Sequence, residues 1–169
     1  LAALAGALAE VRAGAPVVVW AHGRSGIGKS TLIEQFLAES GAMVLAGRCY
    51  ERESVPYKAL DGVIDALSVH LAKLEPALLR ELLPAEAWLL ARLFPVLRRI
   101  AAIEGTGAGA GAGGEVAQAP DPQELRRRGA VALRELMAGL ARVRPVVVHI
   151  DDLQWGDLDS AALLEELLA

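Results

Sequence analysis

The sequence predicts an α/β fold with a mainly parallel β-sheet, and three observations lead to that prediction. Residues 17–21, 43–47 and 146–150 are short apolar runs bounded by turn residues, which is typical of strands buried on both faces of a parallel sheet. The stretches between these runs carry apolar residues at helical spacing. A glycine-rich turn with the sequence GRSGIGKST, residues 23–31, follows the first run and precedes a predicted helix.

The composition of the chain limits the classes of protein to which it can belong. The chain has 169 residues, 54% of them hydrophobic, and a net charge of -4, so we expect one globular domain with no general attraction to nucleic acid or to an anionic membrane. No apolar stretch is long enough to span a bilayer. Cys49 is the only cysteine, which excludes an internal disulfide and fits a cytoplasmic location. Because the sequence lacks an initiating Met and stops inside a helical pattern, we expect residues 1–169 to be one domain from a longer protein.

The first part of the chain is predicted to alternate helices and strands. Residues 1–12 and 29–40 carry apolar stripes at helical spacing, and Gly41 stands where a helix-capping glycine belongs. With the strands expected at residues 17–21 and 43–47, the order is strand, glycine loop, helix, strand. That order predicts a βαβ unit with a right-handed crossover.

The middle of the chain is predicted to be helical. Pro56 is placed to open a helix, and its apolar face consists of Leu60, Val63, Ile64, Leu67 and Leu71. Residues 74–100 are rich in leucine but interrupted by prolines, so we expect short helices that form a helical insertion beside the sheet. Residues 104–120 are low-complexity Gly/Ala sequence, which predicts a flexible loop.

The last part of the chain contains two further helices around a strand. The spacing predicts a helix over residues 121–142, and we interpret Arg126, Arg127 and Arg128 as its solvated face rather than as a phosphate or partner site. The strand expected at residues 146–150 ends in two carboxylates, Asp151 and Asp152. Asp157 or Asp159 can cap the final helix.

The glycine turn matches the phosphate-binding pattern G-x-x-x-x-G-K-[ST] from Gly23 to Ser30. Glycines allow successive backbone N–H groups to converge on one point, and the helix that follows adds the positive end of its dipole. Lys29 is expected to reach the β- and γ-phosphates, Ser30 to bind Mg²⁺, and Thr31 to touch the α-phosphate. The candidate binding residues are Gly23, Arg24, Ser25, Gly26, Ile27, Gly28, Lys29, Ser30 and Thr31. The alternative is an ordinary glycine turn with a surface lysine.

A Mg²⁺ ion between two phosphates needs a further protein ligand, and a carboxylate at the tip of a neighbouring strand can supply it. Asp151 is the candidate for this role. Asp152 follows it and is expected to point the other way along the pleat, where it could orient the attacking water. Asp152 could instead cap a turn or pair with an arginine. Asp152 and Lys29 are therefore the candidate catalytic residues.

The nucleotide is expected to be ATP. GTPases of the Ras type recognise guanine through an N-K-x-D element, and this chain contains no asparagine.

Four separated segments, GRSGIGKST, GRCYERESVPYKAL, DPQELRRR and VVVHIDDLQWGDLDSAALLEELL, resemble the AAA-type P-loop ATPase domain of bacterial STAND signalling proteins. The resemblance implies a three-layer αβα sandwich, with residues 23–31 as Walker A and Asp151 with Asp152 as Walker B. In that family the domain is joined to an effector, such as a serine/threonine protein kinase, an adenylate cyclase or a LuxR-type module, and to a sensor. The resemblance therefore implies a regulatory switch that is driven by exchange of ATP for ADP or by ATP hydrolysis.

The resemblance leaves part of the function open. The family continues past Walker B with further strands and a helical region that this sequence lacks, so ATP turnover is expected in the complete protein and is uncertain in this chain. Arg48 and Arg52 lie on the predicted edge where an arginine finger would act, but we interpret both as solvated loop residues. The alternatives are a nucleotide-binding scaffold without turnover and a small-molecule P-loop kinase.

Overall fold

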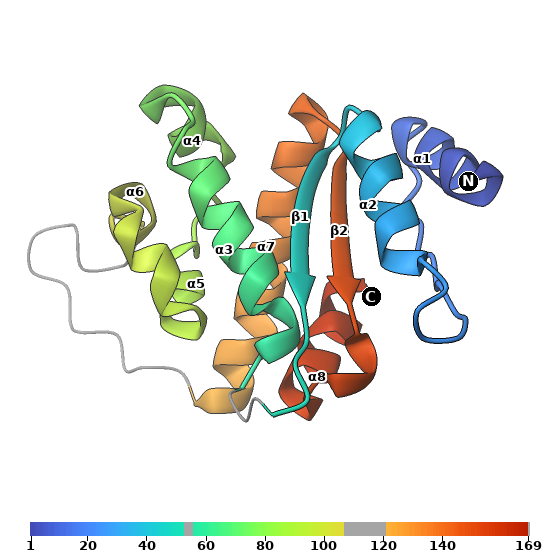
Figure 1. The fold of residues 1–169 in the computed structure, drawn as a ribbon. Helices are drawn as coiled ribbons and strands as arrows, with labels where there is room; N and C mark the ends of the chain where they lie inside the picture. The colour runs from blue at the N-terminus through green and yellow to red at the C-terminus, as the bar shows by residue number, and fades with distance from the viewer. Residues whose placement is uncertain (53–55, 107–120, 169) are drawn as a thin grey trace, which may run out of the picture.

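A computed structural model of the chain describes residues 1–52, 56–106 and 121–168. Its sheet, within those residues, consists of two parallel strands, β1 (Met43–Arg48) and β2 (Val146–Asp151). They pair from Met43 opposite Val146 to Arg48 opposite Asp151. Helices flank this sheet on opposite sides in Figure 1, with α3 and α7 on one side and α1 and α2 on the other. The α/β class and the parallel pairing predicted from the sequence are therefore confirmed.

The helices occupy most of the stretches where the sequence predicts them. They are α1 (Ala2–Arg12), α2 (Lys29–Glu39), α3 (Lys58–Leu71), α4 (Pro76–Leu82), α5 (Trp88–Leu93), the 3-10 helix η1 (Pro95–Arg99), α6 (Ala101–Glu104), α7 (Pro122–Val143), the 3-10 helix η2 (Leu153–Trp155) and α8 (Leu158–Leu168). The short elements from α4 to α6 fall where prolines interrupt the leucine-rich sequence. Their interpretation as an insertion stays a prediction. The predicted Gly/Ala loop lies almost wholly in residues 107–120, outside the described residues.

The strand predicted at residues 17–21 is wrong. This segment forms no ladder with β1 or β2, and the side chains of Val18, Val19 and Trp20 are 52%, 47% and 65% exposed. A valine-rich run becomes a strand only when another strand takes up its N–H and C=O groups. Because β1 and β2 pair with each other, the predicted βαβ unit that begins at residue 17 is absent from the described part of the chain, and the sandwich is incomplete.

The core lies between β1 and the helices α3, α5 and α7. The predicted apolar face of α3 is buried throughout, as are Leu133, Leu136 and Leu140 of α7. Helix α3 approaches the sheet closely because Gly62 faces Gly47, and a Cβ on Gly62 would lie 2.8 Å from the Cα of Gly47. This close packing fixes β1 beneath α3, one residue before β1 ends at Arg48.

The arginine run at the start of α7 is not a solvated face, contrary to the expectation. Arg126 lies 3.7 Å from Asp159 and 3.6 Å from Glu166 of α8, with 26% of its side chain exposed. Arg128 pairs with Glu86, and Arg127 pairs with Glu124. Arg126 therefore links α7 to α8 and Arg128 links it to the turn before α5, whereas Arg127 pairs within α7. Arg127, 62% exposed, is the member that remains mostly in solvent.

A capping carboxylate joins the starts of α3 and α8. Asp157 accepts hydrogen bonds from the backbone N–H of Ser160 at 2.8 Å and of Tyr57 at 3.1 Å. The Ser160 hydroxyl in turn accepts from the backbone N–H of Ala59 at 3.1 Å. Of the two candidates for capping the final helix, Asp157 is the one that does so. The same carboxylate also caps the start of α3.

Candidate functional site

The glycine loop and the start of α2 form an exposed surface rich in backbone N–H groups. Gly26 and Gly28 have φ values of 78° and 90°, a left-handed conformation that side chains disfavour. No side chain caps the amino terminus of α2, so its first N–H groups are available to an outside acceptor. Residues 21–28 are exposed. This arrangement suits an anion that binds over the loop.

Lys29, the first residue of α2, folds back across the loop. Its ammonium group donates to the backbone C=O of Gly23 and of Arg24, both at 2.9 Å. The positive charge is thereby held over the same turn that presents the backbone N–H groups.

The next residue, Ser30, connects the loop to the end of β2. Its hydroxyl donates to a carboxylate oxygen of Asp151 at 3.0 Å, across a sequence separation of 121 residues. Asp151 ends β2, and 22% of its side chain is exposed. The predicted pair is therefore brought into contact, although residues 17–21 do not form the neighbouring strand that the sequence interpretation assumed.

The second carboxylate, Asp152, is held by an arginine. The Arg48 guanidinium donates through Nε at 3.0 Å and through Nη2 at 2.7 Å to the same oxygen of Asp152. Gln154 donates to the other oxygen at 3.1 Å. The hydrogen bonds from Arg48 and then from Gln154 lower the pKa of Asp152, so the carboxylate is ionised at neutral pH.

The backbone explains why both carboxylates lie near Arg48. Asp152 has a φ of 54°, so the chain leaves the extended conformation there and the alternation of the pleat no longer applies. Arg48 Nε lies 3.9 Å from Asp151 as well. The expectation that Asp152 points away from Asp151 is wrong, and pairing with an arginine, the alternative, is what the structure shows.

Arg48 is the residue whose place the sequence interpretation missed. The sequence predicts a solvated loop position for Arg48, yet this residue ends β1 directly opposite Asp151. Its 56% exposed side chain reaches the two carboxylates rather than solvent alone. A basic residue at the end of one strand and acidic residues at the end of another were the available signal, but the register that aligns them could not be read from the sequence.

The site offers few ligands for a metal ion. No group of three or more His, Cys, Asp or Glu side chains comes together among residues 1–52, 56–106 and 121–168. Ser30 and Asp151 would supply a hydroxyl and a carboxylate, which are hard oxygen ligands of the kind that Mg²⁺ takes together with phosphate oxygens and water. The donor set therefore fits Mg²⁺ bound jointly with a phosphate ligand.

Comparisons with known proteins give one match. A family model described as AAA ATPase domain matches residues 1–169. Neither a curated protein nor a solved structure matches the chain. In the part of the chain that the structure describes, no helix is both long and apolar enough to cross a membrane.

Proposed function

The chain belongs to the AAA ATPase domain family, and from that premise we propose that residues 23–31 bind the polyphosphate of ATP together with Mg²⁺. The contact between Ser30 and Asp151 at 3.0 Å carries the proposal, because it joins two distant sequence motifs at one point. Proteins of this family generally use ATP and Mg²⁺, and the donor groups of the loop have the chemistry for both.

Different residues of the loop would bind different parts of the nucleotide. The backbone N–H groups of Gly26, Ile27 and Gly28 would receive phosphate oxygens, and Thr31 would contact the α-phosphate. Lys29 would exchange its two backbone acceptors for the β- and γ-phosphates, which bear full negative charge and attract an ammonium more strongly than a neutral carbonyl does. Arg24 and Ser25 belong to the same loop and would lie next to the bound phosphates.

Ser30 and Asp151 would hold the metal ion. When bound, Mg²⁺ supplies positive charge that offsets the charge of the triphosphate. The hydrogen bond between the two side chains keeps their oxygens within reach of one ion. Asp151 is partly exposed, so a ligand can approach it without rearrangement of the core.

Asp152 is the proposed residue for orienting the attacking water in ATP hydrolysis. Its lowered pKa keeps it ionised and able to accept a hydrogen bond from water, although the same shift makes it a weaker proton acceptor. Arg48 and Gln154, however, occupy oxygens of this carboxylate. That observation favours a second candidate function, a module that binds nucleotide without turnover as long as Arg48 retains Asp152.

The biological role that we propose is a nucleotide-driven switch in a bacterial multidomain signalling protein of the STAND type. The four sequence segments shared with that class support it. The effector would be a serine/threonine kinase or a transcription regulator joined to the same chain, together with a sensor, in the cytoplasm. ATP and ADP would favour different states of the protein.

The first test is nucleotide binding by isothermal titration with Mg-ATP. Lys29→Ala should abolish measurable binding, because it removes the ammonium that faces the phosphates. Lys73→Ala is the matched control, since Lys73 is an exposed lysine outside the site, and it should bind as the unchanged protein does. Equal affinity in the Lys29→Ala protein would refute the site. Phosphate release measured on the same samples separates the ATPase from the module without turnover.

A further inference from the structure

A small pocket lies between the start of β1 and the second half of α3. Its volume is about 230 Å³, and residues 42–45 form its strand side. The helix side consists of residues spaced along one helical face, the last of them just past the end of α3: Ala66, Val69, His70 and Lys73. Pockets for drug-sized ligands have roughly 300–1,000 Å³, so this one suits a smaller molecule.

Arg144 lines the same pocket from the residue pair that precedes β2. Its Nε donates to the backbone C=O of Gly41 at 2.7 Å, which holds the guanidinium beside the turn that leads into β1. The ion pairs within residues 1–52, 56–106 and 121–168 involve Arg48 and the arginines of α7. Neither Arg144 nor Lys73 is therefore neutralised by a carboxylate of the described chain.

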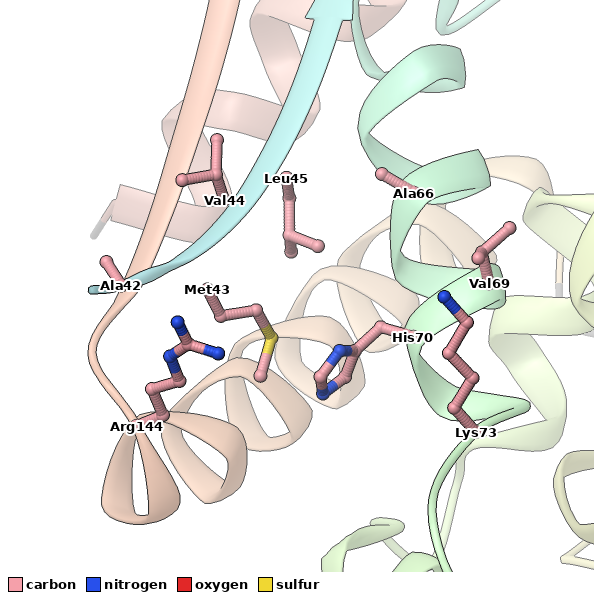
Figure 2. A pocket seen from close by; sticks show the side chains of 9 residues that line it. All are labelled: Ala42, Met43, Val44, Leu45, Ala66, Val69, His70, Lys73 and Arg144. Carbon is pink, nitrogen blue, oxygen red and sulfur yellow. The ribbon is translucent and has the colours of Figure 1, made fainter. Parts of the chain in front are cut away.

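The two cations stand on different sides of the pocket. In Figure 2, Arg144 lies on one side of the Met43 side chain and His70 on the other, with Lys73 beyond His70. Burial and then the charges of Arg144 and Lys73 lower the pKa of His70, which agrees with a position between them. The pocket thus carries two separated positive charges although the chain as a whole has a charge of -4.

One backbone donor adds to these charges. The N–H of Ala42 donates to the Ser40 hydroxyl at 3.1 Å, and the N–H of Met43 donates to Pro145 at 2.7 Å. Alternate residues of a strand direct their N–H groups to opposite edges, so the N–H of Val44 faces away from β2. No strand of the described chain takes it up on that side. It is a donor for an acceptor in the pocket.

We propose that this pocket binds a short-chain dicarboxylate, with one carboxylate against Arg144, the other against Lys73, and the methylene chain over the apolar side chains between them. The Val44 N–H would donate to one of the carboxylate oxygens. Hydrogen bonds from a cation to a carboxylate are stronger than those between neutral groups. The exposed side chains of Val69 and Lys73 leave the pocket open to a ligand from solvent.

The separation of the cations favours two charged groups on the ligand over one. A single oxyanion such as inorganic phosphate would be drawn to Arg144 or to Lys73, with Met43 and His70 between it and the other cation. A peptide strand would find only the Val44 backbone to pair with here, because α3 packs against the Ala46 carbonyl at Gly62. A dicarboxylate uses both cations and needs only one backbone donor.

The pocket is separate from the nucleotide site. It lies at residues 42–45, where β1 begins, whereas Arg48 and the carboxylates lie where β1 and β2 end. Along a strand of this length the two places are separated by roughly 15 Å. Dicarboxylate binding is therefore expected in the Lys29→Ala protein as well, and its failure would not bear on the assignment of the phosphate loop.

The test is isothermal titration of the full chain with succinate, glutarate and adipate, which differ only in chain length. We expect at least one of them to bind, and valerate and inorganic phosphate to bind at least about tenfold more weakly than the best of the three. Lys73→Gln and Arg144→Gln should each weaken that ligand about tenfold, a loss of about 1.4 kcal/mol. Arg80→Gln, at an exposed position of α4 outside the pocket, is the matched control and should change affinity little.

A second readout locates the ligand. In NMR spectra of the full chain, the amide signal of Val44 and the imidazole signals of His70 should shift with the dicarboxylate and not with valerate at the same concentration. Absence of binding by all three dicarboxylates, equal binding of phosphate, unchanged affinity in both pocket variants, or an unchanged Val44 signal would each overturn the proposal. The same spectra show whether each variant is folded, so loss of binding through unfolding is recognised and is not counted as support.

Discussion

Gly62 of α3 rests directly on Gly47 of β1, with room for no side chain between them. This contact sets the depth at which α3 lies on the sheet, and β1 continues from Gly47 to the arginine that holds Asp152. A change at Gly62 should therefore act on stability and on the site together.

Gly62→Ala should destabilise the protein by about 1–3 kcal/mol, because the new methyl group must push α3 away from β1. Denaturant unfolding followed by circular dichroism measures the effect. Gly6→Ala is the control: Gly6 lies inside α1 with nothing within 4 Å of an added Cβ. Alanine there should stabilise by roughly 0.5–1 kcal/mol through helix propensity. If both substitutions behaved alike, the close approach at Gly62 would be wrong.

Ser30→Ala should reduce the dependence of ATP affinity on Mg²⁺, because it removes one of the two side-chain ligands proposed for the ion. Titrations with and without Mg²⁺ give the ratio of affinities, which should fall toward unity. Ser30→Thr keeps the hydroxyl and should retain the ratio. Full Mg²⁺ enhancement in the alanine variant would show that Ser30 is not a ligand.

Arg48→Met should raise the pKa of Asp152 toward the ordinary carboxyl range, since the first cause of its lowering is the hydrogen bond from Arg48. Carboxyl carbon NMR over an acid titration measures this value. Arg52→Met, at an exposed position, is the control and should leave the titration unchanged. The opposite shift, or none, would contradict the ion pair.

The cap at Asp157 should make stability depend on acid. Burial tends to raise the pKa of Asp157, but the hydrogen bonds from Ser160, Tyr57 and Ala59 outweigh it and the pKa is lowered. A group with a lowered folded pKa stabilises the protein above its unfolded pKa, and this contribution is lost as the pH falls through the folded pKa. The loss therefore falls below the ordinary value of 3.8.

Two substitutions separate the charge of Asp157 from its capping role. Asp157→Ala should cost about 1–2 kcal/mol at neutral pH, because the starts of two helices lose an acceptor. Asp157→Asn retains an acceptor oxygen and should cost less, while it removes this residue's share of the acid dependence. Denaturant unfolding at neutral and at strongly acidic pH measures both. An asparagine variant with an unchanged acid profile would assign that dependence to other carboxylates.

Local patterns in the sequence predicted α3 and α7 well because their apolar faces repeat over several turns and are buried in one direction. The same reasoning failed at residues 17–21, because a hydrophobic run indicates that a segment tends to be buried but does not show which strand it would pair with. It also failed for Arg126 and Arg128 of α7, whose partners come from α8 (Asp159 and Glu166) and from the turn before α5 (Glu86).

Within the site, the predicted proximity of Ser30 and Asp151 is confirmed by their hydrogen bond. This contact could be predicted because the two residues were proposed to bind one ligand, not because any local pattern joins them. The place of Arg48 depended instead on the register between β1 and β2 and on the turn at Asp152. Neither the strand register nor this turn can be predicted from the composition of the chain or from the spacing of its motifs.

The uncharged run around Trp20 has a practical meaning for handling this protein. Val18 and Val19, 47–52% exposed, lie beside an indole that is 65% exposed, and together they form an apolar stretch with high β-propensity that favours association. Concentrated samples should aggregate through association at this stretch, which would be measured as increased light scattering. The tryptophan fluorescence, to which Trp20, Trp88 and Trp155 all contribute, should shift to shorter wavelength as the indole of Trp20 loses contact with water.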